Sequence, residues 1–355
     1  MIKHITAKSP NCALYEGVHH LRWQGVEEPS RNGSTVTSPM PVMTTYTHPT
    51  QRVLVSALRD ANPFFHLFEA LWMLAGRNDL AVPQKFVSTF GQFSDDGVTL
   101  NGAYGYRWRK HFGYDQLTRI AEMLSLPGRT RRAVLSMWDG GMSLEGEETD
   151  WPGALNLAML SSDVPCNSHA YFDTIGGKLN MTVLCRSNDI ILGAYGANVV
   201  HMSMLLEYMC ALTGLPMGEY RQFSNDFHIY TEQLSKEQFE TYANTVAASD
   251  IYAADRPIVI IPMISGHNIA EFDTDNLTFF GELDNNPGAH IIGMESPTPF
   301  FEKVVLPMFN SWGMWKAKEF DKADELTASI RATDWRKAAQ GWLNNRRRVR
   351  EEKAK

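Results

Sequence analysis

Two long stretches of the chain repeat apolar residues at the spacing of a helix that packs into a core. The first opens at Asn62, which suits an N-cap, continues with Pro63 at the first helical position and stops at Gly76. The second covers residues 199–213 and stops at Gly214. The pattern therefore predicts two core helices, each with its own start or stop signal.

Two further segments have a helical pattern with one polar face. Residues 114–124 carry a single apolar face, formed by Leu117, Ile120, Ala121 and Leu124. Residues 321–355 are predicted to form a charged helix that contains the basic run Asn-Asn-Arg-Arg-Arg-Val-Arg at 344–350. Such a run is more often a solvated helix face than a binding patch, so it gives little support to a nucleic-acid partner.

Alternation with a period of two predicts β-structure in the middle of the chain. Residues 168–173 and 178–186 are expected to form a hairpin through a Thr-Ile-Gly-Gly turn. Short apolar runs at 133–138, 220–223 and 258–262 predict three more strands. The chain therefore mixes strands and helices.

The remaining segments bear on domain organisation. Residues 26–50 are rich in Pro, Ser, Thr and Gly and predict loop and edge strand, while residues 139–162 form an acidic, aperiodic insertion. No internal repeat or interdomain linker interrupts the sequence. We therefore predict one α+β domain, with a mixed or antiparallel sheet packed by helices. Its catalytic part spans 1–265, and an extension packed on the same domain spans 266–355.

Composition narrows the class of protein. The chain has 355 residues, of which 44% are hydrophobic and 21% charged, as in ordinary soluble enzymes. Its net charge of −7 argues against general nucleic-acid binding, which needs a basic field. The four cysteines lack metal-ligand spacing, and neither a signal peptide nor a membrane-length apolar run is visible. We expect a cytoplasmic protein without a metal or a membrane partner.

Cys166 is the strongest candidate nucleophile. It follows a proline at a strand entrance, and Arg186 lies across the predicted hairpin, where its charge would lower the pKa of the thiol. An inert buried thiol is the alternative. Glu69 lies inside the first apolar helix, where a carboxylate must be paired, hydrogen-bonded or shifted in pKa. A structural ion pair and a chemical role both stay open for Glu69.

Other polar residues add binding capacity. Arg31 stands beside the backbone donors of an Asn-Gly-Ser-Thr segment, and Arg131-Arg132 precedes a predicted strand. Both arrangements suit either a solvated turn or an anion site. Residues 163–230 combine a nucleophile, an arginine, an amide and hydroxyl binders. This combination indicates an enzyme that acts on a phosphorylated small molecule.

The order of these motifs resembles that of the thymidylate synthase superfamily, which includes thymidylate synthases and pyrimidine nucleotide hydroxymethylases. The resemblance covers about residues 25–265 and is carried by Arg31-Asn-Gly-Ser-Thr, Glu69-Ala-Leu-Trp, Gly102-Ala-Tyr104-Gly-Tyr-Arg-Trp-Arg109, Asp115-Gln, Arg131-Arg132, Pro165-Cys166, Arg186-Ser187-Asn-Asp189-Ile-Ile-Leu-Gly193 and Asn225-Asp226-Phe-His228-Ile-Tyr230. The Arg-Ser-x-Asp piece, at a fixed distance from Pro-Cys, is the most specific. The resemblance implies the thymidylate synthase fold and a homodimer that uses one face of the sheet.

The resemblance also implies a role for each matching residue in catalysis. Cys166 would add to C6 of a pyrimidine and make C5 nucleophilic, while Glu69 and Tyr104 would move protons around the base. Asp189 would act beside the pterin of 5,10-methylenetetrahydrofolate, the implied co-substrate. Asn198 would read the base edge, although it also suits the N-cap of the following helix.

Binding of the nucleotide is implied in the same way. The sugar 3′-hydroxyl would be held by His228 and Tyr230. The 5′-phosphate would be bound by Arg31, Arg186 and Ser187, with Arg131 and Arg132 reaching in from a second subunit.

Several departures from synthases bear on the product. Asn167 stands where histidine is usual, and the segment 90–97 lacks the tryptophans that would stack on folate. The charged C-terminal end does not resemble the apolar tail that keeps water from the methylene intermediate. We therefore expect a dUMP hydroxymethylase that releases 5-hydroxymethyl-dUMP, with thymidylate synthase and dCMP hydroxymethylase as alternatives. A catalytically silent nucleotide or RNA binder is a different class, which predicts that Cys166→Ala retains function.

Overall fold

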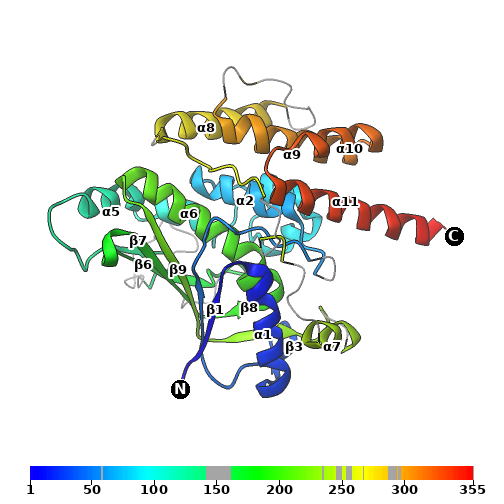
Figure 1. The fold of residues 1–355 in the computed structure, drawn as a ribbon, viewed down its shortest axis with the longest axis horizontal. Coiled ribbons are helices and arrows are strands. Elements are labelled where there is room, and N and C mark those ends of the chain that lie inside the picture. The colour runs from blue at the N-terminus through cyan, green and yellow to red at the C-terminus, as the bar shows by residue number, and fades with distance from the viewer. Residues whose placement is uncertain are drawn as a thin grey trace.

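A computed structural model of the chain shows a six-stranded sheet, two central helices beside it and a group of C-terminal helices on their far side (Figure 1). It describes residues 1–56, 59–140, 161–233, 236–244, 250–252, 258–266, 268–286, 294 and 297–354. The insertion predicted at 139–162 lies almost entirely outside the described residues. The mixture of elements confirms the predicted α+β class.

The larger sheet has the strand order β1-β4-β9-β7-β6-β5. Its strands are β1 (Lys3–Ala7), β4 (Val42–Tyr46), β5 (Val134–Ser136), β6 (Asn167–Asp173), β7 (Leu179–Cys185) and β9 (Met217–Ser224). The antiparallel pair of β6 and β7 is the predicted hairpin, whereas β7 runs parallel to β9. The sheet is therefore mixed, as predicted.

A second sheet of four strands has the order β2-β3-β10-β8. Its strands are β2 (Val26–Ser30), β3 (Gly33–Thr37), β8 (Asn188–Asp189) and β10 (Phe227–Tyr230). The prediction of loop and edge strand over 26–50 gave too few strands, since this segment contains β2, β3 and β4. All five residues of β2 are exposed, so no apolar alternation marks it as a strand.

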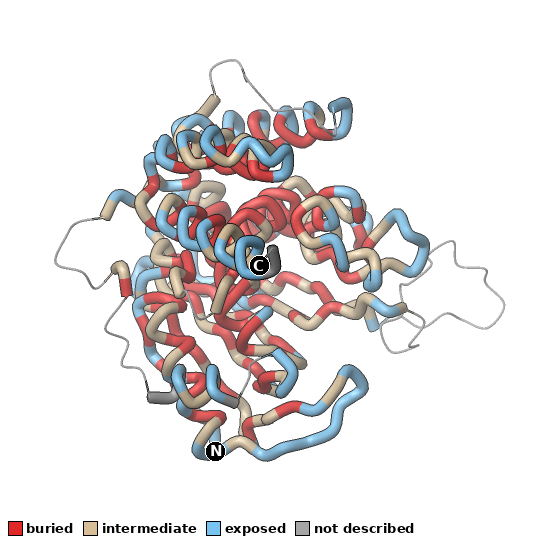
Figure 2. Tube along the Cα trace, turned by 90° about the vertical axis from the view of Figure 1, so that its right-hand side faces the viewer, coloured by how far each residue is buried: buried red, intermediate tan, exposed pale blue. Residues whose placement is uncertain are grey.

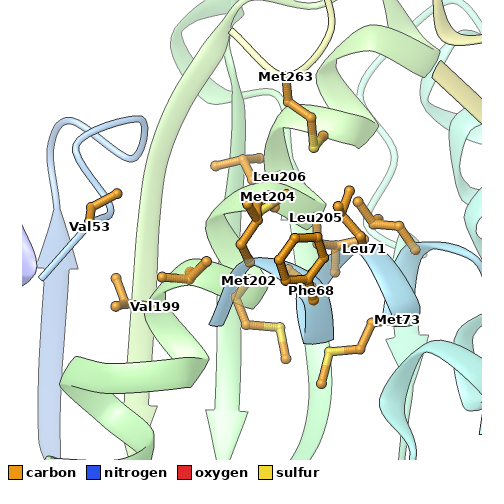
Figure 3. Close-up of a cluster of buried hydrophobic side chains, with 14 of the residues drawn as sticks. Val53, Phe68, Leu71, Met73, Val199, Met202, Met204, Leu205, Leu206 and Met263 are labelled. Carbon is orange, nitrogen blue, oxygen red and sulfur yellow. The ribbon is translucent and has the colours of Figure 1, made fainter. Parts of the chain in front are cut away.

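The two predicted core helices are confirmed as α2 (Pro63–Leu74) and α6 (Asn198–Thr213). The side chain of Asn62 accepts a hydrogen bond from the Phe65 amide and caps α2. Gly76 and Gly214 follow the helices with φ of 66° and 69°, a backbone conformation that favours glycine. Figure 3 shows apolar side chains of α2 and α6 meeting in the core.

α6 directly follows a π-helical segment, η5 (Ile190–Ala197), and the chain kinks near their junction at Gly196, where φ is −111° and ψ is −107°. Together they span Ile190–Thr213, which has the length and hydropathy of a membrane span. However, 83% of its most apolar 18-residue stretch is buried inside the fold. A core helix of a globular protein can have the same length and hydropathy, so this segment gives no reason to place the chain in a membrane. Figure 2 shows that buried positions gather in the middle of the molecule.

Shorter helices complete the part of the fold that precedes α8. They are α1 (Pro10–Gln24), α3 (Ala81–Phe86), η1 (Ser88–Phe93), α4 (Tyr104–Tyr106), η2 (Arg107–His111), α5 (Gln116–Leu124), η4 (Ile175–Gly177) and α7 (Lys236–Asn244). α5 confirms the helix predicted at 114–124 but begins two residues later, because Asp115 is its N-cap and accepts a hydrogen bond from the Thr118 amide.

The C-terminal helices are α8 (Ile269–Asn285), η6 (Phe301–Val305), α9 (Leu306–Lys316), α10 (Phe320–Ser329) and α11 (Thr333–Ala354). The prediction of one helix over 321–355 was wrong. The chain breaks between α10 and α11 because Ile330 and Ala332 are drawn into the core, with 0% exposure each. Aromatic contacts join these C-terminal helices to α2. The ring centroid of Phe64 lies 5.4 Å from that of Trp312 and 5.7 Å from that of Trp342.

The strand predicted at 258–262 is also absent from the structure, which describes these residues as extended chain. Val259 instead exchanges hydrogen bonds with Thr333 at the start of α11, through its amide (3.1 Å) and its carbonyl (2.8 Å). The start of α11 therefore supplies the hydrogen-bond partners that a neighbouring strand would otherwise provide.

Candidate active site

A cavity of about 580 Å³ opens where α2, α4, the entrance of β6 and the η5–α6 helix meet. Half of the residues predicted for the site line it: Glu69, Tyr104, Cys166, Ser187, Asp189 and Asn198. They come from four separate parts of the chain, and the fold brings them to one cavity.

Cys166 is held in place by its neighbours before any ligand binds. Its amide and that of Asn167 both donate to the Tyr104 hydroxyl, each at 3.2 Å. Arg186 donates to the carbonyls of Pro165 (2.9 Å) and Val164 (3.1 Å), and its guanidinium lies 3.9 Å from the Cys166 sulfur. Burial raises the pKa of the thiol, and the charge of Arg186 acts in the opposite direction.

Glu69 is buried on α2 and faces α6. Its Oε2 lies 3.1 Å from His201 Nε2, so the carboxylate has a polar neighbour within its apolar surroundings. Asp163 approaches the same cavity and accepts a hydrogen bond from the Gly102 amide at 2.6 Å. Burial is the main cause that raises the pKa of Asp163 to about 6.

Asn198 belongs to a buried row of amides. Its Nδ2 donates to Asn188 Oδ1 (3.2 Å), and its Oδ1 accepts from Asn167 Nδ2 (3.4 Å). Asn188 Nδ2 in turn donates to Ser224 at 2.9 Å. The N-cap interpretation of Asn198 was wrong, because Asn198 is already helical, with φ of −60° and ψ of −37°, and its side chain bonds to Asn188 and Asn167 instead of to an amide of α6.

Asp189 uses only one of its two oxygens within the protein. Oδ1 accepts from the amides of Ile191 (2.6 Å) and Leu192 (2.8 Å) and so caps η5. Oδ2 is buried, with no hydrogen-bond partner among the described residues. Burial raises the pKa of Asp189, and the backbone donors oppose this. A carboxylate oxygen is therefore left on the cavity wall for a ligand.

Arg31 and Tyr230 lie together in a second cavity of about 640 Å³. The two cavities adjoin, since Gln92, Phe93 and Leu192 line both. Arg31 is exposed at the turn between β2 and β3, as the solvated-turn interpretation predicted. His228 lines neither cavity; its Nδ1 lies 2.7 Å from Asp226 Oδ1, and β10 sets it opposite Asp189 of β8.

Arg131 and Arg132 do not join the other site residues within the chain. Both are exposed in the connection between α5 and β5, where they line a separate shallow pocket. Their proposed reach into the site of a second subunit stays a prediction.

Comparison with known proteins shows the family to which this chain belongs. Residues 14–272 match the sequence profile of the family described as thymidylate synthase. The chain belongs to the thymidylate synthase family. It is 40% identical to a Pseudomonas phage M6 protein named deoxyuridylate hydroxymethyltransferase, over 98% of this chain and 95% of that protein. A protein of the same name from Bacillus phage SP01 is 34% identical over 56% of this chain and 52% of its own length.

A solved structure supports the fold of this family member. The crystal structure of thymidylate synthase from T4 phage aligns with a TM-score of 0.52, covering 65% of this chain and 80% of that one. The sequences are 16% identical, so this likeness concerns the fold alone.

Three features of the site were not predicted. His201 looked like part of an apolar helix face, and only its spacing of three residues from Asn198 could have drawn attention to it. Asn188 is buried in the row of amides, which only the fold assembles. Phe90 and Phe93 form an aromatic pair on the cavity wall, with ring centroids 5.5 Å apart.

Proposed function

We propose that this chain transfers a one-carbon unit from 5,10-methylenetetrahydrofolate to C5 of dUMP and releases 5-hydroxymethyl-dUMP. The observation that carries the proposal is the match along nearly the whole of both chains to the phage M6 protein named deoxyuridylate hydroxymethyltransferase. The cavity supports it chemically, since a thiol, a carboxylate and an amide line the same space.

Cys166 is the nucleophile in this proposal. As the thiolate it adds to C6 of the pyrimidine, and C5 then becomes an enolate-like nucleophile that takes up the methylene group. The Tyr104 hydroxyl oxygen accepts hydrogen bonds from the Cys166 and Asn167 amides, so its own proton can be donated to a nearby acceptor. Arg186 supports the thiolate by charge.

Asn198 is the proposed reader of the base. A primary amide donates to O4 of uracil and accepts from N3–H, whereas cytosine presents an amino group and an unprotonated N3 instead. The row from Asn167 through Asn198 to Asn188 supports one fixed orientation of the Asn198 amide. This favours dUMP over the alternative substrate dCMP.

The folate and the nucleotide require different walls of the site. Asp189 Oδ2, which is buried without a hydrogen-bond partner among the described residues, suits a pterin N–H. Phe90 and Phe93 offer ring faces for the folate in place of tryptophans. In the proposal Arg31, Arg186 and Ser187 hold the phosphate, and His228 and Tyr230 the sugar.

A homodimer is part of the proposal because the described residues leave one face of the six-stranded sheet uncovered. The register row His4–Met43–Phe223–Leu184–His169 is exposed or half-exposed throughout. The next row, Ile5–Thr44–Gln222–Val183–Ala170, is buried throughout. A second copy covering the open face would bring its Arg131 and Arg132 to the phosphate. All four cysteines are free, which suits the proposed cytoplasmic location.

Release of tritium from C5-labelled nucleotide tests the first half of the reaction. With methylenetetrahydrofolate, the protein is expected to release tritium from labelled dUMP faster than from labelled dCMP, and Cys166→Ser is expected to release none. Exchange from neither nucleotide would overturn the Cys166 mechanism. Faster exchange from dCMP would overturn the choice of base.

Dihydrofolate formation separates the two products within the family. A thymidylate synthase oxidises the folate while it reduces the methylene group, and dihydrofolate raises the absorbance. Hydroxymethylation leaves the folate as tetrahydrofolate, so the expected result is nucleotide turnover without that rise. A rise in proportion to turnover would establish thymidylate synthase instead.

A further inference from the structure

His201 is a buried histidine that the proposed roles leave unused. It lies on α6, with 3% of its surface exposed, and lines the same cavity as Cys166. Neither ring nitrogen has a hydrogen-bond partner among the described residues, although Nε2 approaches Glu69 Oε2 to 3.1 Å. A buried imidazole without hydrogen bonds is costly, so its presence calls for a ligand or a reaction.

The position of His201 places it beside the nucleotide site. It follows Asn198 by three residues on α6, and residues at this spacing lie on the same helix face. Glu69 faces it from α2. A carboxylate next to an imidazole fixes the ring and stabilises the imidazolium, which is the arrangement of a general base.

The other histidine that lines this cavity is unsuited to the task. His66 precedes Glu69 by three residues on α2 and lines the same cavity. Burial, with smaller contributions from Arg59 and His201, lowers the pKa of His66 well below its usual range. His66 is therefore a weak proton acceptor.

We propose that His201, oriented by Glu69, is the general base for the water that completes hydroxymethylation. This inference rests on the proposed function and adds the residue that activates the final acceptor. At that stage Cys166 is bonded to C6. Asp163 Oδ2 accepts from the Gly102 amide, and Asp189 caps η5 with Oδ1 and offers Oδ2 to the pterin in the proposed function. His201 is assigned to this step alone, after the methylene group has reached C5.

The step is balanced in atoms and electrons. An O–H bond of water breaks, its proton passes to His201, and the oxygen bonds to the exocyclic methylene carbon. The methylene π electrons move through C5 to the C4 carbonyl and form an enolate. The enolate restores the C5–C6 double bond and expels the Cys166 thiolate, whose charge balances the proton held by His201. The product is 5-hydroxymethyl-dUMP, and no oxidant or reductant takes part.

Substitution of His201 should separate the two halves of the reaction. In His201→Gln, tritium release from C5 is expected to persist, while the rate of 5-hydroxymethyl-dUMP formation falls by about 10²- to 10⁴-fold. The nucleotide is then expected to accumulate as an adduct on Cys166 that survives denaturation. The matched control is His20→Gln, since His20 is also buried but hydrogen-bonds Ser38 outside the cavity. It should form product at the wild-type rate.

A second variant makes the test independent of how well glutamine is accommodated. His201→Ala with added imidazole is expected to regain product formation, since imidazole supplies both the lost volume and the lost base. Undiminished product formation in His201→Gln would overturn the inference. Equal loss of tritium release and product in a folded variant would also overturn it, because His201 would then act before water addition.

Failure of this inference differs from failure of the proposed function. If the wild-type protein forms dTMP and dihydrofolate, the proposed function itself is wrong. If it forms 5-hydroxymethyl-dUMP and His201→Gln does so equally fast, only the role of His201 is wrong.

Discussion

The reactivity of Cys166 is set by two opposing influences. Burial is the larger and raises the pKa of the thiol, while the guanidinium of Arg186 lowers it. The sequence predicted this pairing, because the two residues face each other across a recognisable hairpin. It did not predict His201 beside Glu69, since that contact joins two helices whose packing no local pattern specifies.

Alkylation of Cys166 tests this balance through pH. Because the thiolate is the reactive form and the pKa is raised, reaction with iodoacetamide should be slow near neutral pH and speed up as pH rises. Arg186→Met removes the influence that lowers the pKa, so the alkylation profile should move to higher pH. Mass spectrometry of the Cys166 peptide measures it.

Cys12 provides an internal control in the same samples. Burial and Asp250 raise the pKa of Cys12 to about 11, and Arg186 is not among the causes. Its alkylation should be the same in both proteins. Faster alkylation of Cys166 in Arg186→Met would contradict the electrostatic role of Arg186.

Elements with strong local signals could be predicted, and elements defined by partners could not. α2 carries its cap and stop in the sequence, and α6 its stop. The apolar run at 258–262 has the composition of a strand, but its backbone bonds to Thr333 at a helix terminus. The break between α10 and α11 likewise follows from burial of Ile330, which is a tertiary effect.

A substitution in α4 tests how firmly this short helix holds Cys166 in place. A Cβ on Gly105 would overlap the backbone of Met73 in α2, and Gly105 directly follows Tyr104, whose hydroxyl holds Cys166. We expect Gly105→Ala to lower the free energy of unfolding by about 1–3 kcal/mol and to reduce activity. Urea denaturation measures the change in stability.

Gly341 is the matched control for this substitution. It is exposed on α11, with nothing within 4 Å of an added Cβ. Gly341→Ala should raise the free energy of unfolding by about 0.5–1 kcal/mol, because alanine has less freedom in the unfolded chain. A Gly105→Ala variant as stable as wild type would show that α4 can move away from α2 without loss.

On the scale of the whole molecule, the residues predicted for the site fall into two groups. Most site residues meet in two adjoining cavities, but Arg131 and Arg132 stand apart from both. The sequence indicated this division only through the family resemblance, because spacing along one chain does not specify contacts between two.

Leu184→Lys tests whether a second copy covers the open face of the six-stranded sheet. Leu184 is half-exposed beside Phe223 in the open row, so a lysine there would place charge in a dimer interface. Light scattering after size exclusion should show a dimer for the wild type and a monomer for the variant, with activity lost. Leu277→Lys on α8, where leucine is 62% exposed, should stay dimeric and active. A monomeric and active wild type would contradict the shared site.

The mass of the nucleotide product tests the central claim most directly. The protein is incubated with dUMP and methylenetetrahydrofolate, and the nucleotides are then analysed by mass spectrometry, with Cys166→Ser as the inactive control. Hydroxymethylation predicts a product heavier than dUMP by the mass of CH₂O, absent from the control. A product heavier by CH₂ alone would be dTMP and would contradict the claim.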